Sequence, residues 1–353
     1  MRKKLALLLV LLFVFSTMLV GCSTPGDTGQ QEETEGEAPE EAAAPAQKIQ
    51  VNIITGSTGG TYFALGGAMA NTWNEFLDNV QVTSQPGGAS VESINRVHAG
   101  ECELGMAMNN IADDAWKGQG AFPAEQQNFR AIGVIYPEVY QGVALKESGI
   151  TSIEGLKGKR VAVGPVGSGT VVMSETVFNE AGLTFDDVKA AFDGFGDAAS
   201  KMKDGHLDAA FNVLAVPAAA IQDIMTARDI EVIEIGDDLY KKVKAKYPFF
   251  SQYVIPAGTY GNEEDKLTIN CVAALYVAPE MSEDAVYDIT KVWFEQTAHT
   301  AAAHGAAQWL ADEIAAGNKQ VMIDGITTPL HPGAYKYFTE IGLDIPDMIK
   351  PID

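Results

Sequence analysis

Apolar and polar residues along the chain follow two spacings, which predict a repeating order of strands and helices. Apolar residues alternate with polar ones over residues 49–53, which predicts a strand, and over residues 62–76 they recur three and four positions apart, which predicts one face of a helix. The same order recurs over residues 80–100, with Ser90 placed to cap the helix, and over residues 104–116. This alternation is typical of an open, mostly parallel sheet with helices on both faces.

A second α/β series begins near Ile150 and is flanked by two long β-prone runs. The first run covers residues 130–145 and is interrupted by Pro137, and the second covers residues 268–278. We interpret the two runs as crossings between two lobes. Between and after them the pattern predicts strands at 160–163, 190–192, 208–212 and 231–235, and helices at 168–181, 198–203, 217–227, 282–300 and 305–316.

Two Gly/Ser/Thr-rich loops fall at corresponding places in the two predicted lobes. Lobe 1 comprises residues 49–138 plus 268–353, and lobe 2 comprises residues 139–267. Residues 55–62 lie between a strand and a helix in lobe 1, and residues 164–170 do so in lobe 2. A helix start carries unpaired N–H groups and the positive end of the helix dipole, which favour a carboxylate or phosphate. Two such loops facing one another across a hinged cleft would enclose a small anion.

The N-terminal region predicts a location outside the cytoplasm. Basic residues at positions 2–4 precede a short apolar run, and residues 19–22, Leu-Val-Gly-Cys, closely resemble the lipobox of bacterial lipoproteins. That resemblance implies cleavage before Cys22 and lipidation of its side chain, and the alternative is a simple signal peptide. We assign residues 1–21 to a lipoprotein signal peptide and the acidic, Pro-containing residues 22–48 to a disordered tether. The globular part would then be lipid-anchored at a membrane, in the periplasm or on the outer face of the cytoplasmic membrane.

Charge and cysteine content narrow the classes of partner. The formal net charge is −23 at pH 7 and there is no basic tract, which disfavours nucleic acid as a partner. The length of 353 residues leaves room for about two domains. Besides Cys22 the chain contains Cys102 and Cys271, and the sequence leaves open whether these two form a disulfide or remain buried thiols.

Known motifs for catalysis, nucleotide binding and metal binding are absent from the sequence. The second loop lacks the Gly-Lys-Ser/Thr ending of a P-loop, neither loop has a Gly-x-Gly-x-x-Gly pattern, and there is no Gly-x-Ser-x-Gly elbow. His299 and His304 are five positions apart and therefore do not share a helical face. Acidic pairs such as Asp237-Asp238 are interpreted as solvated charge runs. We expect no cofactor, no metal site and no catalytic residues.

Six short motifs occur in a fixed order along the chain: Gly56–Tyr62, Pro86–Glu92, Leu156–Gly164, Gly167–Thr170, Ile255–Tyr260 and Pro329–Ala334. Together, over residues 49–343, they resemble the TAXI family of solute receptors for TRAP transporters. The resemblance implies an α/β, two-lobed periplasmic-binding-protein fold of type II with two β-rich hinge crossings. It also implies capture of glutamate, glutamine or a related C5 dicarboxylate, and delivery to a TRAP membrane permease driven by an ion gradient.

The resemblance and the positions of the loops predict a ligand site. The family's site involves the first Gly-rich loop, and Ser90, Asn109 and the second loop would join it by position. Asn109 stands where we expect glutamine, and Tyr136 lies at an element end beside a candidate loop. Neutral dipoles would hold the anion, because the loops contain no arginine. The predicted ligand-binding residues are Thr58, Gly59, Gly60, Thr61, Tyr62, Ser90, Asn109, Tyr136, Ser168, Gly169, Thr170 and Asn212.

The sequence thus predicts a monomeric, lipid-anchored receptor for a small organic acid, not an enzyme. Two other classes stay open. One is a receptor of the same architecture that serves an ATP-driven importer or a sensor kinase. The other is a secreted two-lobed enzyme.

Overall fold

A single mixed sheet of ten strands runs through residues 48–352, the part of the chain that the computed structural model describes. The predicted signal peptide and the predicted tether, with Cys22, lie outside the described residues, except for Lys48. Within residues 48–352 no helix combines the length and the apolar character that a membrane crossing requires.

The strands and helices follow the predicted order, with a few additions. The strands are β1 (Ile49–Ile54), β2 (Val80–Gln85), β3 (Leu104–Met108), β4 (Arg130–Leu145), β5 (Arg160–Ala162), β6 (Lys189–Ala191), β7 (Ala209–Leu214), β8 (Ile230–Ile233), β9 (Ser251–Ile255) and β10 (Lys266–Val277). The helices are α1 (Thr61–Phe76), α2 (Ser90–His98), α3 (Asn109–Lys117), α4 (Gly169–Glu180), α5 (Phe195–Lys203), α6 (Ala219–Met225), α7 (Asp237–Lys246), α8 (Glu283–Glu295), α9 (Thr297–Ala303), α10 (Gln308–Ala315) and α11 (Pro332–Glu340).

Two long strands, β4 and β10, connect two groups of parallel strands. The strand order is β2-β1-β3-β10-β4-β7-β5-β6, with β8 paired to β4 and β9 paired to β10. β1 is parallel to β2 and β3, and β5 is parallel to β6 and β7, whereas β4 and β10 are antiparallel to one another. Residues 273–277 of β10 pair with β3, while residues 266–270 pair with β9. Each long strand therefore belongs to both groups.

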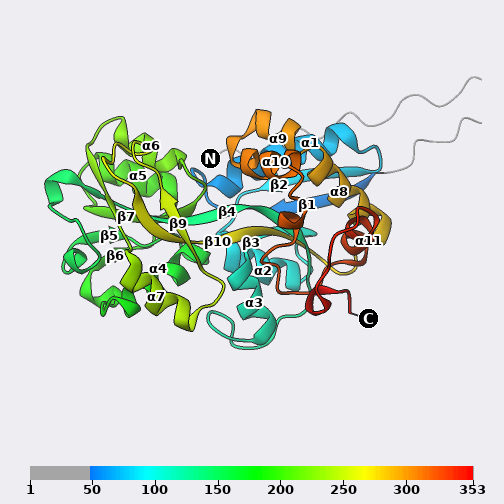
Figure 1. The fold of residues 1–353 in the computed structure, drawn as a ribbon, viewed down its shortest axis with the longest axis horizontal. Helices are drawn as coiled ribbons and strands as arrows, with labels where there is room; N and C mark the ends of the chain where they lie inside the picture. The colour runs from blue at the N-terminus through cyan, green and yellow to red at the C-terminus, as the bar shows by residue number, and fades with distance from the viewer. Residues whose placement is uncertain (1–47, 353) are drawn as a thin grey trace, which may run out of the picture. The chain divides into compact units, whose positions relative to one another are not determined.

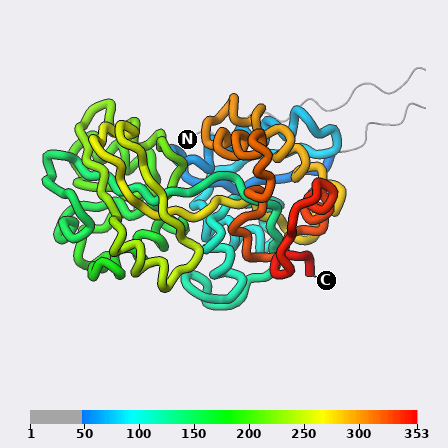
Figure 2. The backbone as a smooth tube through the Cα atoms, viewed as in Figure 1, coloured from blue at the N-terminus to red at the C-terminus, as the bar shows by residue number. Residues whose placement is uncertain are grey.

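Each group of parallel strands has its own helices (Figure 1). We call the group containing β1–β3 lobe 1 and the group containing β5–β7 lobe 2. The C-terminal helices α8–α11 return to lobe 1, where α8 and α9 contact α1. The backbone tube shows β4 and β10 passing side by side from one lobe into the other (Figure 2). The predicted α/β, two-lobed periplasmic-binding fold of type II with two crossing segments is confirmed, and the exact lobe boundaries stay a prediction.

Helix α1 shows how the predicted apolar face is buried. Leu65, Met69 and Trp73, four positions apart, are almost completely inaccessible to solvent. The indole Nε1–H of Trp73 donates a hydrogen bond of 2.9 Å to the main-chain carbonyl of Ile289 in α8. This bond satisfies the polar atom of a buried aromatic ring and attaches the C-terminal helices to α1.

Ser90 does not cap α2, so that prediction is wrong. Ala89 occupies the N-cap position with a φ of 70°, and Ser90 is the first residue of the helix. The Ser90 hydroxyl oxygen instead accepts a hydrogen bond of 3.1 Å from the N–H of Met108. The Ser90 side chain is thus bonded to the neighbouring strand β3, although the local sequence predicts that it caps the helix.

Pro137 does not interrupt the first crossing strand, which runs unbroken over β4. Pro137 lies opposite Val272 of β10, and the register shifts nearby, where Tyr136 and Val134 face consecutive residues of β10 and Ile135 faces none. Such a bulge lets a strand accommodate a residue without an N–H group.

The structure divides one predicted helix and adds three elements. The helix predicted at 282–300 breaks at Gln296 into α8 and α9. There the Thr297 hydroxyl donates a 2.6 Å hydrogen bond to the carbonyl of Trp293, a side-chain bond that competes with the helical pattern. Helix α7, strand β9 and helix α11 were not predicted. The pair Asp237-Asp238, interpreted as a solvated run, begins α7, where negative charge complements the helix dipole.

Candidate functional site

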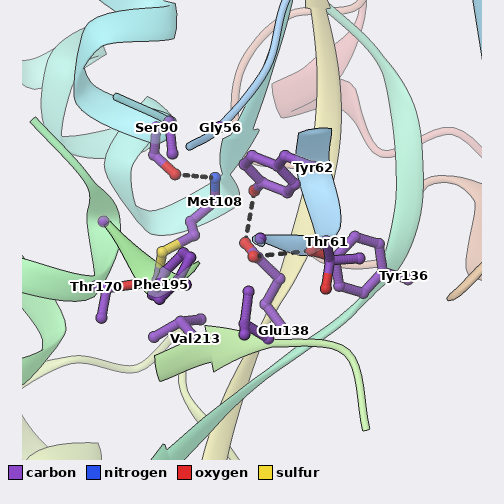
Figure 3. A pocket seen from close by; sticks show the side chains of 14 residues that line it. Gly56, Thr61, Tyr62, Ser90, Met108, Tyr136, Glu138, Thr170, Phe195 and Val213 are labelled. Atoms are coloured by element: carbon purple, nitrogen blue, oxygen red, sulfur yellow. Dashed lines mark hydrogen bonds between the residues drawn. The ribbon is translucent and has the colours of Figure 1, made fainter. Parts of the chain in front are cut away.

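A small cavity lies where the first turns of α1 and α4, from different lobes, come together (Figure 3). Each of these helices follows a strand through one of the two Gly-rich loops, β1 in lobe 1 and β5 in lobe 2. The cavity is lined by Gly56, Gly60, Thr61, Tyr62, Ala89, Ser90, Met108, Tyr136, Glu138, Gly169, Thr170, Phe195, Val213 and Leu214. Both predicted loops therefore contribute to one site.

The first residues of both helices line this cavity. α1 has Gly60 at its N-cap, with no side-chain cap and no acidic residue in the first turn. α4 also lacks an acidic residue in its first turn, and its N-cap residue Ser168 accepts a hydrogen bond of 3.2 Å from the N–H of Val171. Because the first N–H groups of a helix have no intrahelical acceptor, these two starts favour an anion between them.

The start of α2 has a different role. The N–H groups of Val91 and Glu92 donate hydrogen bonds of 3.0 and 3.1 Å to the carbonyl oxygen of Gly167 in lobe 2. A carbonyl from the opposite lobe thus fills the position that an anion would take at this helix start. The side chain of Ser90, beside it, lines the cavity (Figure 3).

Two further hydrogen bonds join the lobes near the cavity. The N–H of Gly196 donates to the carbonyl of Thr58 at 3.3 Å, and the N–H of Ala215 donates to the hydroxyl of Thr61 at 3.2 Å. The cavity has a volume of about 20 Å³, whereas an adjoining outer cavity, which shares Gly60 and Thr61 with it, has about 350 Å³. The inner volume exceeds only slightly the ~10–15 Å³ that one water molecule needs. A larger solute therefore does not fit the inner cavity in this arrangement of the lobes.

Glu138 of β4 is the one carboxylate in the cavity lining. Its side chain is 3% exposed. The hydroxyl of Tyr62 donates a 2.6 Å hydrogen bond to Oε2, and the hydroxyl of Tyr136 donates a 3.1 Å hydrogen bond to Oε1 (Figure 3). The two tyrosine rings meet edge to face, with centroids 6.1 Å apart. The carboxylate is thus held in a fixed position by one donor from α1 and one from its own strand.

Burial dominates the electrostatics of this carboxylate. No lysine, arginine or histidine is among the residues that line the cavity. Burial raises the pKa of Glu138 to about 8. The hydrogen bonds from Tyr62 and Tyr136 stabilise the ionised form and act in the opposite direction, lowering this pKa. The same burial, with the nearby Glu138 charge, raises the pKa values of Tyr62 and Tyr136, so both stay protonated as donors.

Sequence analysis missed Glu138 as a candidate site residue. The available signal was one acidic residue within a long apolar run, directly after Pro137. Glutamate is rarely buried without a partner, so a glutamate in a predicted crossing strand could have been noted as an unusual position. The run alone does not reveal which face of the strand it occupies.

The cavity brings together part of the predicted ligand-binding set, and contact of these residues with a ligand stays a prediction. The predicted residues that line the cavity are Gly60, Thr61, Tyr62, Ser90, Tyr136, Gly169 and Thr170. Gly59 lines the outer cavity, and Thr58 lies beside it at the contact with Gly196. Ser168 caps α4 at the edge of the site.

Asn109 and Asn212 lie outside the cavity lining. Asn109 donates through Nδ2 to the carbonyl of Gly325 at 2.8 Å and accepts at Oδ1 from the N–H of Val272 at 3.3 Å, so it joins α3 to β10. Asn212 lies in β7 opposite Gln141 of β4. Its buried Nδ2 has no hydrogen-bond acceptor among the described residues.

Neither a metal cluster nor a disulfide occurs within residues 48–352. No group of three or more His, Cys, Asp or Glu side chains in this range is arranged to hold a metal ion. Cys102 and Cys271 are both buried and both free thiols, which resolves the alternative that the sequence left open.

Three solved structures are distantly similar to this chain. A protein from Bordetella bronchiseptica RB50 is 17% identical with a TM-score of 0.49, and the match covers 85% of this chain and 91% of that chain. The periplasmic aliphatic sulphonate binding protein SsuA from Escherichia coli is 15% identical with a TM-score of 0.41, covering 75% and 78%. An ancestral arginine-binding protein bound to arginine is 17% identical with a TM-score of 0.45, covering 75% and 97%.

One protein family matches most of the chain. The sequence profile of the NMT1-like family matches residues 53–342. This range starts within β1 and ends after α11, so it includes both Gly-rich loops, both crossing strands and the cavity between the lobes. The chain therefore belongs to the NMT1-like family.

Proposed function

We propose that this protein is an extracytoplasmic solute receptor that binds a small organic acid between its lobes and delivers it to the permease of a TRAP transporter. The observation that carries the proposal is the pairing of two helix starts without acidic first-turn residues, α1 and α4, around one cavity. The six motifs that resemble the TAXI family support the transporter class. The same resemblance makes glutamate, glutamine and related C5 dicarboxylates the first ligands to test.

Main-chain groups and hydroxyls supply the binding chemistry. The N–H groups at the starts of α1 and α4 receive a carboxylate of the ligand, since helix starts attract negative charge. The hydroxyls of Thr61, Ser90 and Thr170 add donors that rotate to suit the ligand. Tyr62 and Tyr136 provide aromatic walls beside this carboxylate position.

Closure of the lobes couples binding to delivery. The lobes are joined near the cavity by a few hydrogen bonds, which end on the carbonyl oxygens of Gly167 and Thr58 and on the hydroxyl of Thr61. A ligand that contacts α1 and α4 together binds the closed arrangement better than an open one and shifts the population toward it. The permease then recognises the closed surface.

A thermal-shift screen over small organic acids tests the proposed binding. A ligand in excess of its dissociation constant raises the melting temperature, because it stabilises the folded state. The Thr61→Ala and Thr170→Ala variants are expected to weaken binding of the best ligand about tenfold each. Thr339→Ala, which removes an exposed hydroxyl on α11, serves as the matched control. Unchanged affinity in both cavity variants would disprove the site, and turnover of the acid would indicate an enzyme.

Separate experiments test the anchor and the transporter. If Cys22 is lipidated, the protein partitions into the membrane fraction of its native host, and Cys22→Ser releases it. Uptake assays in the native host distinguish the transporter classes. Collapse of the ion gradient stops uptake by a TRAP permease, whereas uptake that persists until ATP is depleted indicates an ATP-driven importer.

A further inference from the structure

When it is ionised, Glu138 places a negative charge inside the cavity that the two helix starts make favourable for an anion. The carboxylate lies on β4, which crosses between the lobes, and Tyr62 links it to the first turn of α1. An anionic ligand carboxylate at the helix starts would share this small cavity with Glu138, and two carboxylates in one buried site repel each other. A ligand that is only an acid therefore binds only while Glu138 keeps its proton.

The lining residues contain no cation that could balance this charge. The groups that face the carboxylate are the hydroxyls of Tyr62 and Tyr136 and, across the β4–β10 ladder, Cys271. Both tyrosines stay protonated and neutral, and burial raises the pKa of the Cys271 thiol. A buried charge is stable only when it is paired or when it is neutralised by a proton. Glu138 therefore keeps its proton unless the ligand supplies a cation.

The carboxylate of Glu138 also has room for further donors. A carboxylate has about four lone-pair positions, and the two tyrosines occupy one on each oxygen. An ammonium group carries three N–H donors and is compact enough to approach both oxygens. The two tyrosine hydroxyls hold the carboxylate in a fixed position.

We infer that Glu138 binds the ammonium group of the ligand, so that this receptor selects α-amino acids over acids of the same carbon skeleton that lack the amine. The inference rests on the proposed function, since it takes the helix starts of α1 and α4 as the site of the ligand carboxylate. Within the proposed ligands it favours glutamate and glutamine and disfavours plain C5 dicarboxylates. The α-amino and α-carboxylate groups of the ligand bring one charge of each sign, and each meets its complement in the cavity.

The binding of an ammonium group requires Glu138 to be ionised. The raised pKa of Glu138, about 8, means that the empty site holds a proton at neutral pH, so binding releases that proton. Affinity for an amino acid therefore rises as pH increases toward 8. An acid without an amine gains nothing from ionisation of Glu138, and its affinity falls over the same range.

Matched pairs of ligands test the inference on the unmodified protein. The pairs are L-glutamate with 2-oxoglutarate, L-aspartate with oxaloacetate, L-leucine with 4-methyl-2-oxopentanoate and L-alanine with pyruvate, with L-glutamine added alone. Thermal shift identifies binders, and calorimetry in two buffers of different ionisation enthalpy counts released protons. We expect at least one amino acid to bind about 30-fold or more tightly than its oxo acid, with proton release at pH 7.

A charge-neutral variant provides the second measurement. Glu138→Gln is expected to weaken amino acid binding about 30-fold or more. It should also narrow or reverse the preference for the amino acid over its oxo acid, because the ionised Glu138 no longer repels the carboxylate of the ligand. Glu175→Gln makes the same change in net charge on the exposed face of α4 and should change neither affinity.

The outcomes separate this inference from the proposed function. Equal or tighter binding of an oxo acid by the unmodified protein overturns the role of Glu138 while leaving an organic-acid receptor intact. Unchanged selectivity in a folded Glu138→Gln variant overturns it as well. Absence of any thermal shift across the whole panel counts against both. Should Glu138→Gln not fold, the selectivity of the unmodified protein still decides.

Discussion

The hydroxyl of Tyr62 lies 2.6 Å from Oε2 of Glu138, and this hydrogen bond connects the first turn of α1 with the strand that crosses between the lobes. The bond is buried, and the second carboxylate oxygen of Glu138 is bound by Tyr136. Tyr62, a proposed ligand-binding residue, is thereby attached to a strand that crosses between the lobes.

Folding stability should fall as pH rises toward 8, because of Glu138. Burial raises the pKa of Glu138 from 4.5 to about 8 in the folded chain. Between these values the unfolded chain has lost the proton that the folded chain keeps, so the free energy of unfolding decreases with pH by at most ~1.4 kcal/mol per unit and levels off above pH 8. Urea unfolding at pH 5, 6.5 and 8 measures this slope.

The Glu138→Gln variant isolates the contribution of this one carboxylate. The variant lacks the titrating group, so its stability relative to the unmodified protein should increase from pH 5 to pH 8 by a few kcal/mol. Glu175→Gln, exposed on α4, should track the unmodified protein at every pH. Parallel pH profiles for the unmodified protein and Glu138→Gln would refute a raised pKa at this site.

Tyr62→Phe should destabilise the folded protein, and more so at pH 8 than at pH 5. The substitution removes the donor to Oε2, and the ionised carboxylate, which needs that donor most, is the form present at higher pH. The expected loss in the free energy of unfolding is about 1–3 kcal/mol. Tyr140→Phe is the control, because the Tyr140 hydroxyl is bonded to Ser174 at 3.3 Å and not to Glu138. Equal pH dependence in both variants would contradict the role assigned to Tyr62.

Gly59→Ala should weaken ligand binding by hindering closure of the lobes. A Cβ atom at Gly59 would lie 2.7 Å from the main-chain nitrogen of Gly196 in lobe 2, closer than such atoms approach in proteins. The closed arrangement would lose population to more open ones, and the apparent affinity would fall by the same factor. Calorimetry gives the affinity, and solution scattering should show a larger radius of gyration for the variant.

Gly258→Ala is the matched control for that experiment. Gly258 has the same φ as Gly59, +85°, but no atom lies within 4 Å of the added Cβ. Both substitutions therefore cost similar backbone strain, whereas Gly59→Ala alone creates a contact between the lobes. If the two variants lose affinity to the same extent, strain and not closure explains the effect.

Local patterns in the sequence determined the main features of this protein. The strand, Gly-rich turn and helix at residues 49–76 follow from the spacing of neighbouring apolar residues and from turn chemistry, as does the second loop at residues 164–170. The two long β-prone runs predicted the crossing strands β4 and β10. Their order along the chain was sufficient to predict a two-lobed α/β fold, because short connections leave few topologies.

The tertiary structure alone decided which polar groups meet. Tyr62 and Glu138 are 76 positions apart, so neither the burial of that carboxylate nor its donors can be deduced from neighbouring residues. Likewise, the carbonyl oxygen of Gly167 accepts hydrogen bonds from the first N–H groups of α2, and the N–H of Met108 donates to the hydroxyl of Ser90. Local capping rules had predicted that Ser90 caps α2. Periodicity records which side of an element is buried, whereas the partners of a buried polar atom depend on packing between distant segments.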